Sequence, residues 1–144
     1  MKYLLDTCVV SELASKKPDK NVVRWIDSID PEIAYLSVIT IGEIQRGIEK
    51  DPSSTRKIKL QQWLDVDLIN KFEGRIIPLD LPIMMEWGRL TARMQSIGKP
   101  LPAVDSMIAA IAIHHNYVLV TRNEKDFQTS GVTLLNPWEW KPEL

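Results

Sequence analysis

Strand-length apolar runs alternate with longer helical patterns along most of this 144-residue chain. The helical patterns, in which apolar residues recur at helical spacing, are predicted at 38–50, 55–72, 83–96 and 103–115. The strand-length runs are continuous rather than alternating, which is typical of strands covered on both faces, and are predicted at 2–6, 33–36, 75–79, 117–121 and 132–135. Strands separated by helices form parallel βαβ units. We therefore predict an α/β fold, a three-layer α/β/α sandwich with a mostly parallel sheet of four or five strands.

Length and composition narrow the class of protein further. At roughly 100–200 residues per domain, the length predicts a single domain over residues 1–144. The sole cysteine, Cys8, excludes intramolecular disulfides and thiolate zinc clusters and fits a reducing compartment. No apolar stretch is long enough to span a membrane, and Asp6 interrupts the N-terminal segment where a signal peptide would be apolar. We expect a cytoplasmic protein without a membrane segment.

Four acidic residues lie where the predicted topology brings separate segments together. Asp6 ends the first predicted strand, and Glu43 lies near the start of the helix after the second. Asp105 lies in the first turn of a buried helix, and Asp126 follows the fourth strand. Helices that follow parallel strands begin at the carboxyl edge of the sheet, where ligands bind in α/β folds. The four acids are therefore predicted to converge on one rim.

Each acid taken alone also has a structural interpretation. Asp6 could cap the helix that follows it, and Glu43 could be a solvated helix residue. Asp105 could complement a helix dipole, and Asp126 could be a turn residue beside a buried Phe127. Convergence is what favours chemistry, because clustered carboxylates raise one another's pKa unless cations neutralise them. Mg²⁺ or Mn²⁺ suits an all-carboxylate site with waters, and such a site hydrolyses phosphodiesters.

Four motifs in order resemble the PIN-domain ribonucleases, in particular the VapC/FitB-type toxins of prokaryotic toxin–antitoxin pairs. They are LLDTCVVSEL, LSVITIGEIQRGI, LPAVDSMIAAIAIHH and LVTRNEKDF followed by NPW, and they span the chain from Lys2 to Trp138. The resemblance implies a metal-dependent endoribonuclease that forms a homodimer and is held inactive by a cognate antitoxin protein. It also implies Mg²⁺ or Mn²⁺ as the cofactor, and RNA products with 5′-phosphate and 3′-hydroxyl ends.

By position, Asp6, Glu43 and Asp105 match the three acids of that family. The resemblance implies that Asp6 and Asp105 bind the metal directly. Glu43 and a fourth acid would complete the catalytic site, partly through water. We assign the fourth position to Asp126, although many relatives carry an acid where this chain has Asn123.

Three further residues are implied as supporting the site: Thr7, Thr121 and Asn123. In the family the hydroxyl that Thr121 matches would position a water or an acid side chain. Cys8 stands where the family usually has asparagine, and a thiol anchors neighbouring carboxylates less well than an amide. The resemblance and this departure together predict a complete but looser site.

The charges of the chain, as well as the resemblance, bear on its binding partners. The formal net charge is −1, so the chain as a whole lacks the basic character of a non-specific nucleic-acid binder. Local contacts to RNA phosphates are predicted for the basic residues Lys16, Lys17, Lys20, Arg24 and Arg46, with a solvated charged face as the alternative. An anionic crevice is also a receptor for an arginine or lysine inserted by an antitoxin.

Two alternatives stay open at this level. The chain could be a degenerate PIN-type module that binds RNA or a protein without cutting, which the residues Cys8 and Asn123 favour. It could instead be a phosphatase with Asp6 as nucleophile. That chemistry usually needs a second aspartate two residues later, where this chain has Cys8.

Overall fold

The computed structural model describes residues 1–143 and contains a five-stranded sheet in the order β3-β2-β1-β4-β5. Every strand pairing within these residues is parallel. The strands are β1 (Tyr3–Leu5), β2 (Ala34–Ser37), β3 (Ile76–Ile77), β4 (Val118–Val120) and β5 (Leu134–Leu135). The predicted α/β fold with a parallel sheet is thus confirmed, with strands shorter than the apolar runs. Ile33 was predicted to begin the second strand, but it ends a 3-10 turn, η1 (Pro31–Ile33).

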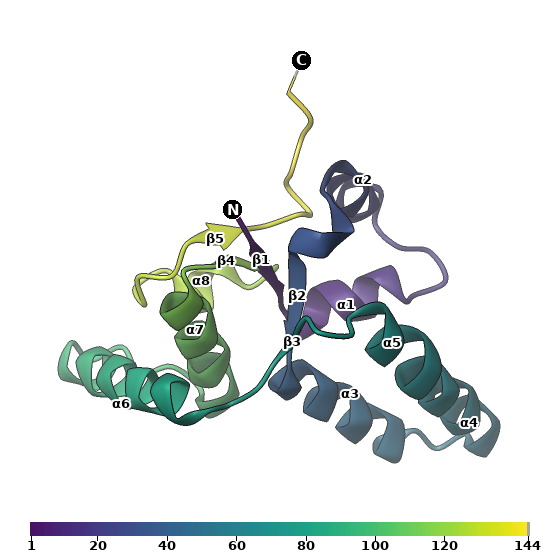
Figure 1. Cartoon of the computed structure of the whole chain (residues 1–144), viewed down its shortest axis with the longest axis horizontal. Coiled ribbons are helices and arrows are strands. Elements are labelled where there is room, and N and C mark those ends of the chain that lie inside the picture. Colours follow the sequence, from purple (N-terminus) through teal and green to yellow (C-terminus); the bar gives the residue numbers. More distant parts are fainter. Residues whose placement is uncertain (144) are drawn as a thin grey trace.

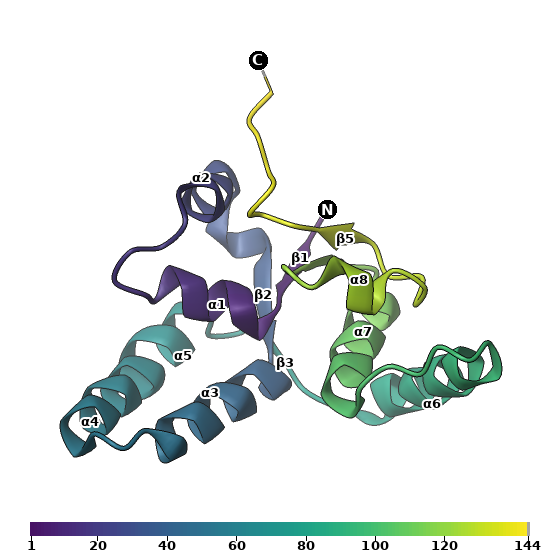
Figure 2. The ribbon, with the colours of Figure 1, turned by 180° about the vertical axis from the view of Figure 1, so that it is seen from behind.

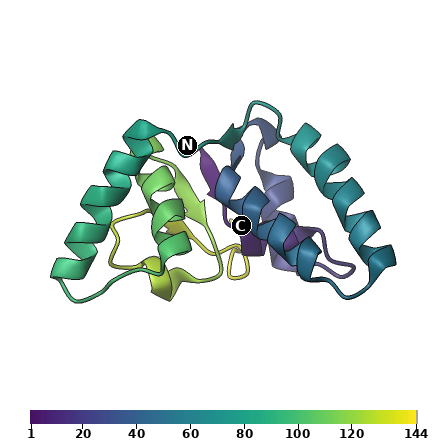
Figure 3. The same cartoon turned by 90° about the horizontal axis from the view of Figure 1, so that it is seen from below.

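Helices cover both faces of the sheet (Figures 1 and 3). One face carries α6 (Leu81–Ser96), α7 (Ala103–His115) and the short α8 (Glu124–Phe127). The other carries α1 (Thr7–Leu13), α2 (Lys20–Ser28), α3 (Val38–Lys50), α4 (Ser54–Gln62) and α5 (Ile69–Lys71). A π-helical segment, η2 (Trp63–Leu68), joins α4 to α5, so the helix predicted at 55–72 is one rod with a local change of pitch.

Helices α1 and α2 do not appear in the predicted pattern because polar residues separate them and both are short. Asp19 accepts hydrogen bonds from the backbone N–H groups of Asn21 and Val22, which caps α2. Val22 and Trp25 then face the core from helical positions three residues apart. A helix cap followed by this spacing was the signal that could have located α2.

Successive strand residues supply two separate hydrophobic cores. Leu4 and Leu119 pack beneath α6 and α7, whereas the next residues along, Leu5 and Val120, pack beneath α1 and α2. Side chains alternate between the faces of a strand, so a strand covered on both sides must be apolar throughout. The second core is centred on the fully buried Trp25.

The strand order places a topological switch point between β1 and β4. From β1 the chain leads through α1 and α2 to β2, which pairs with β1 on one side. Strand β4 pairs with β1 on the other side and is reached only after α7. Helices α1 and α3 begin side by side at the ends of β1 and β2 (Figures 1 and 2). Ligands of open α/β sheets bind outside the carboxyl ends at such a point. In the described part of the chain, no helix is both long and apolar enough to cross a membrane.

Candidate active site

Asp6 joins the two strands at the switch point. Its backbone N–H donates to the Val120 carbonyl at 2.9 Å, and its Oδ1 accepts from the Thr7 N–H at 2.8 Å. Its Oδ2 accepts from the Thr121 hydroxyl at 2.8 Å, and Thr121 is fully buried at the end of β4. Asp6 therefore does cap α1, as the structural interpretation held. Because each carboxylate oxygen has two acceptor positions, this cap leaves room for a further ligand.

Glu43 is held against the start of α1 by hydroxyl groups. The Thr7 Oγ1 donates to Glu43 Oε1 at 2.6 Å, and it lies 3.0 Å from the Oγ1 of the fully buried Thr40. The Thr7 hydroxyl has one proton, so the nearer acceptor, Glu43 Oε1, takes it in place of Thr40 Oγ1, the second acceptor within reach. The sequence analysis did not identify Thr40, although its place three residues before Glu43 on one helix was a usable signal.

The acids influence one another's ionisation. Burial raises the pKa of Asp105 above its usual 3.8, and the charges of Asp6, Asp126 and Glu43 raise it further. The pKa of Asp6 is also raised, by burial first; the hydrogen bonds from Thr121 and Thr7 oppose that rise, and the charge of Glu43 adds to it. The charges of the other three predicted acids thus act on Asp105 in one electrostatic cluster, with Asp6 at the N-cap of α1 and the others on α3, α7 and α8.

Asp126 and Asn123 both lie on the segment that follows β4. Asp126 is exposed on α8, whose Phe127 is fully buried in the core below α7. The Asn123 backbone N–H donates to Thr121 Oγ1 at 3.1 Å, which ties this segment to Asp6 through one shared hydroxyl. Asp126 thus follows the fourth strand as predicted, on a short helix rather than in a turn, and the buried Phe127 beside it anchors the segment.

Cys8 lies against the same carboxylate. Its Sγ is 3.8 Å from Asp6 Oδ2 and 3.7 Å from Thr121 Oγ1. Burial, and then the charge of Asp6, raises the pKa of the Cys8 thiol. The protonated thiol is therefore a weak hydrogen-bond donor to Asp6, in the position where an asparagine amide would donate more strongly.

No ion pair neutralises the cluster within residues 1–143, where the two ion pairs are Arg56–Asp51 and Arg89–Glu86. Nor do three or more His, Cys, Asp or Glu side chains of these residues form a ready-made metal cage. The donor set fits a hard divalent cation held by one or two carboxylates and several waters, which is the usual mode of Mg²⁺. The five basic residues predicted to contact RNA are exposed, on the α1–α2 loop, α2 and α3, and their role stays a prediction.

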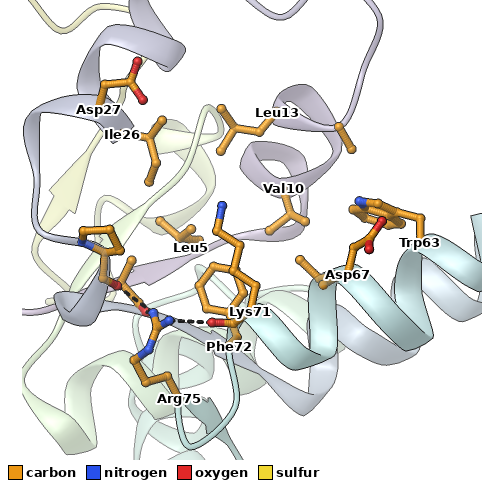
Figure 4. Close-up of a pocket in the computed structure, with 14 residues that line it drawn as sticks. Leu5, Val10, Leu13, Ile26, Asp27, Trp63, Asp67, Lys71, Phe72 and Arg75 are labelled. Atoms are coloured by element: carbon orange, nitrogen blue, oxygen red, sulfur yellow. Dashed lines mark hydrogen bonds between the residues drawn. The ribbon is translucent and has the colours of Figure 1, made fainter.

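A separate cavity of about 380 Å³ lies between α1, α2 and the η2–α5 segment. Its lining is mostly apolar and includes none of the four acids (Figure 4). At one side, the Arg75 guanidinium donates to the carbonyls of Pro31, Ala34 and Lys71, which ties β3 to the loop before β2. This cavity is therefore part of the scaffold, distinct from the acidic cluster.

The raised pKa of Asp105 predicts how the metal-free protein responds to pH. The folded state holds the Asp105 proton more tightly than the unfolded state, so this contribution to stability is present at low pH. It is lost as the pH rises from the usual 3.8 through the raised value. Asp105→Asn cannot ionise, and we expect it to raise the Tm in EDTA at pH 7.5 by about 2–4 °C, after allowance for solvent screening.

Thermal melting at pH 4 and pH 7.5 checks this expectation. The gain should be smaller at pH 4, where Asp105 of the parent protein is more often protonated. Asp27→Asn, an exposed acid on α2 outside the cluster, serves as the matched control and should change the Tm little. A lower Tm for Asp105→Asn at both pH values would contradict the argument.

Comparison with known proteins agrees with this geometry. The PIN domain family model matches residues 3–130. The chain is 35% identical over 136 residues to a protein named VapC ribonuclease Y4jK of Sinorhizobium fredii, covering 94% of this chain and 97% of that one. It is also 35% identical over 135 residues to Toxin FitB of Neisseria gonorrhoeae, covering 94% and 97%.

A solved structure shows the same fold. The crystal structure of FitAcB from Neisseria gonorrhoeae superimposes with a TM-score of 0.91 at 34% identity, over 96% of this chain and 99% of that one. Sequence similarity and fold thus agree with the motifs recognised in the sequence. The chain belongs to the PIN-domain family and, within it, to the VapC/FitB-type toxins.

Proposed function

We propose that this protein is a metal-dependent endoribonuclease, the toxin of a type II toxin–antitoxin pair, acting on RNA in the cytoplasm. The observation that carries the proposal is the acidic cluster at the switch point. Asp6 is fixed there by Thr121, and Glu43 by Thr7, with no ion pair to these acids in the described residues. The similarity to a relative named as a ribonuclease, over almost the whole chain, supports it.

In this proposal Asp6 and Asp105 hold Mg²⁺ or Mn²⁺. When bound, such an ion supplies Lewis-acid polarisation of the phosphoryl group. Glu43 accepts a hydrogen bond from the attacking water and orients it, and Asp126 completes the anionic rim. The water oxygen bonds to phosphorus as the water gives a proton to the Glu43 carboxylate, the P–O3′ bond breaks, and O3′ takes up a proton from solvent, so the products carry 5′-phosphate and 3′-hydroxyl ends.

RNA cleavage after removal and return of metal tests the proposal. Protein dialysed against EDTA should leave a structured RNA intact, and added Mn²⁺ or Mg²⁺ should restore cleavage. A 5′-phosphate-dependent exonuclease should then degrade the downstream product. If calorimetry detects no Mn²⁺ binding and the RNA stays intact, the protein is a binding module without catalysis. An aspartyl-phosphate trapped with a small phosphodonor would favour the phosphatase alternative.

The negative charge of the acidic cluster also supports an antitoxin partner. A crevice with unneutralised carboxylates binds an inserted arginine or lysine through charge-assisted hydrogen bonds. We expect a cognate antitoxin protein to suppress cleavage by occupying the cluster, and we expect the toxin itself to form a homodimer. Light scattering on the isolated toxin, and cleavage assays with the protein encoded beside it, check the two expectations.

Loss of the hydroxyl that holds Glu43 should lower activity without unfolding the protein. We expect Thr7→Val to reduce the cleavage rate by about 10–100-fold, because groups that orient a metal-site carboxylate typically have effects of this size. Thr7→Ser keeps the hydroxyl and should retain most of the rate. Cleavage kinetics and circular-dichroism melting of the two variants measure the contrast, and equal rates would contradict the role of this hydrogen bond.

A further inference from the structure

Two hollows lie on either side of Asp126. The larger, of about 410 Å³, lies between the segment after β4 and the segment after β5, and its lining includes Arg122 and Asn136. The smaller, of about 290 Å³, is lined in part by the loop before α7, including Lys99. Lys125, Asp126 and Gln128 line both. The two hollows therefore share part of their lining at the fourth acid, and together they are termed the path.

The cations along this path have no acidic partner in the described part of the chain. Both ion pairs of residues 1–143 lie elsewhere, so Lys99, Lys125 and Arg122 are available to an external anion. The Arg122 guanidinium lies 5.1 Å from the centroid of the Trp138 ring. The backbone of Trp138 is itself fixed. Its carbonyl accepts from Asn21 Nδ2 at 2.8 Å, and its backbone N–H donates to Asn136 Oδ1 at 3.0 Å. Arg122 is thus held in place by a cation–π contact rather than by a carboxylate.

Polar groups of a second kind share the larger hollow. The amide side chains of Asn123, Gln128 and Asn136 line it together with Arg122. Amides carry both donors and acceptors, as base edges do, and the unstacked bases of single-stranded RNA are recognised on those edges. Both hollows are about the size of small-ligand sites, so each can take a single nucleotide.

We propose that Arg122, Lys125 and Lys99 bind backbone phosphates of the RNA beside the acidic cluster, along the surface that Asp126 borders. This inference rests on the proposed function and deepens it by naming residues that hold the RNA backbone. The acidic cluster repels phosphates, so the strand needs cations beside the cluster to stay bound. Glu124 and Glu139 also line the larger hollow, and loss of either cation there leaves that surface more anionic.

The salt dependence of RNA binding tests the path independently of cleavage. A fluorescent 12-nucleotide single-stranded RNA is titrated with the cleavage-deficient Asp6→Asn protein at 50–200 mM KCl. Lys99→Gln, Lys125→Gln and Arg122→Gln are added to it one at a time. Each is expected to raise the Kd by about two- to fivefold and to lower the slope of log K against log salt by about 0.7.

Lys59→Gln is the matched control, because Lys59 is an exposed lysine on α4, far from α8 (Figures 1 and 3). It should change neither Kd nor slope. The inference is overturned if the three test variants behave like Lys59→Gln or if the RNA does not bind. In each case metal-dependent cleavage by the parent protein would still stand, whereas absence of that cleavage overturns the proposed function itself.

Discussion

Asp6→Asn is expected to lower RNA cleavage by at least about 100-fold while the protein stays folded. A bound ion contributes several kcal/mol of transition-state stabilisation, and each 1.36 kcal/mol is a factor of ten in rate, so loss of a metal-binding carboxylate costs two or more orders of magnitude. Asparagine keeps an oxygen that can accept from the Thr7 N–H, the bond that Asp6 makes at 2.8 Å. The Thr121 hydroxyl can turn to accept from the new amide.

A second helix cap is the control for this variant. Asp80 caps α6 by accepting from the Ile83 N–H at 3.2 Å, and its charge acts on His115, at the opposite end of α7 from Asp105. Asp80→Asn should therefore cleave RNA at the parent rate. Single-turnover kinetics with Mn²⁺ and circular-dichroism melting compare the variants. Cleavage by Asp6→Asn at the parent rate would refute the role of Asp6 as a metal ligand.

Phe127→Ala is expected to destabilise the protein by about 3–5 kcal/mol, the usual cost of removing a buried aromatic side chain. Phe127 is 0% exposed and packs in the core below α7. Helix α8 has four residues, of which only Phe127 is buried, so this side chain anchors the segment that carries Asp126. Because domains of this kind have 5–15 kcal/mol of stability in general, the loss is a large fraction of the total.

Urea unfolding measures that loss, and Phe127→Leu is the graded control. Leucine keeps most of the apolar volume, so its cost should be near 1 kcal/mol. At a temperature where Phe127→Ala is still folded, we also expect slower cleavage, because Asp126 loses its fixed position. A loss below about 1 kcal/mol for Phe127→Ala would show that α8 is held by other contacts.

Much of the fold could be predicted because its physical cause is local. Continuous apolar runs and helical spacing are properties of short segments, and they located the strands and the helices α3, α6 and α7. Helix α2 was not located, because its apolar face is short and follows a polar loop; its stability comes from Trp25 in the core. Likewise, the π-helical pitch of η2 has no local signal in the residue pattern.

The candidate site, too, could be predicted only in part. Topology alone predicted that Asp6, Glu43 and Asp105 would meet, since helices after parallel strands start at one edge of the sheet. It did not predict Thr40, whose hydroxyl matters only because α1 and α3 begin side by side. Nor did it predict Lys99, because this residue becomes a neighbour of Asp126 only when the loop before α7 and the segment after β4 are in place.

By itself the sequence determined the family and the order of the strands and the longer helices, and it nominated the acids, because periodicity and motifs are written in consecutive residues. The tertiary structure alone decided which atoms hold those acids. Asp6 and Thr121 are 115 positions apart, and Thr7 and Glu43 are 36 apart, yet each pair shares a hydrogen bond. Such bonds require separate segments to be positioned to within a few tenths of an ångström. The packing of the two cores sets these positions, and no local sequence pattern encodes them.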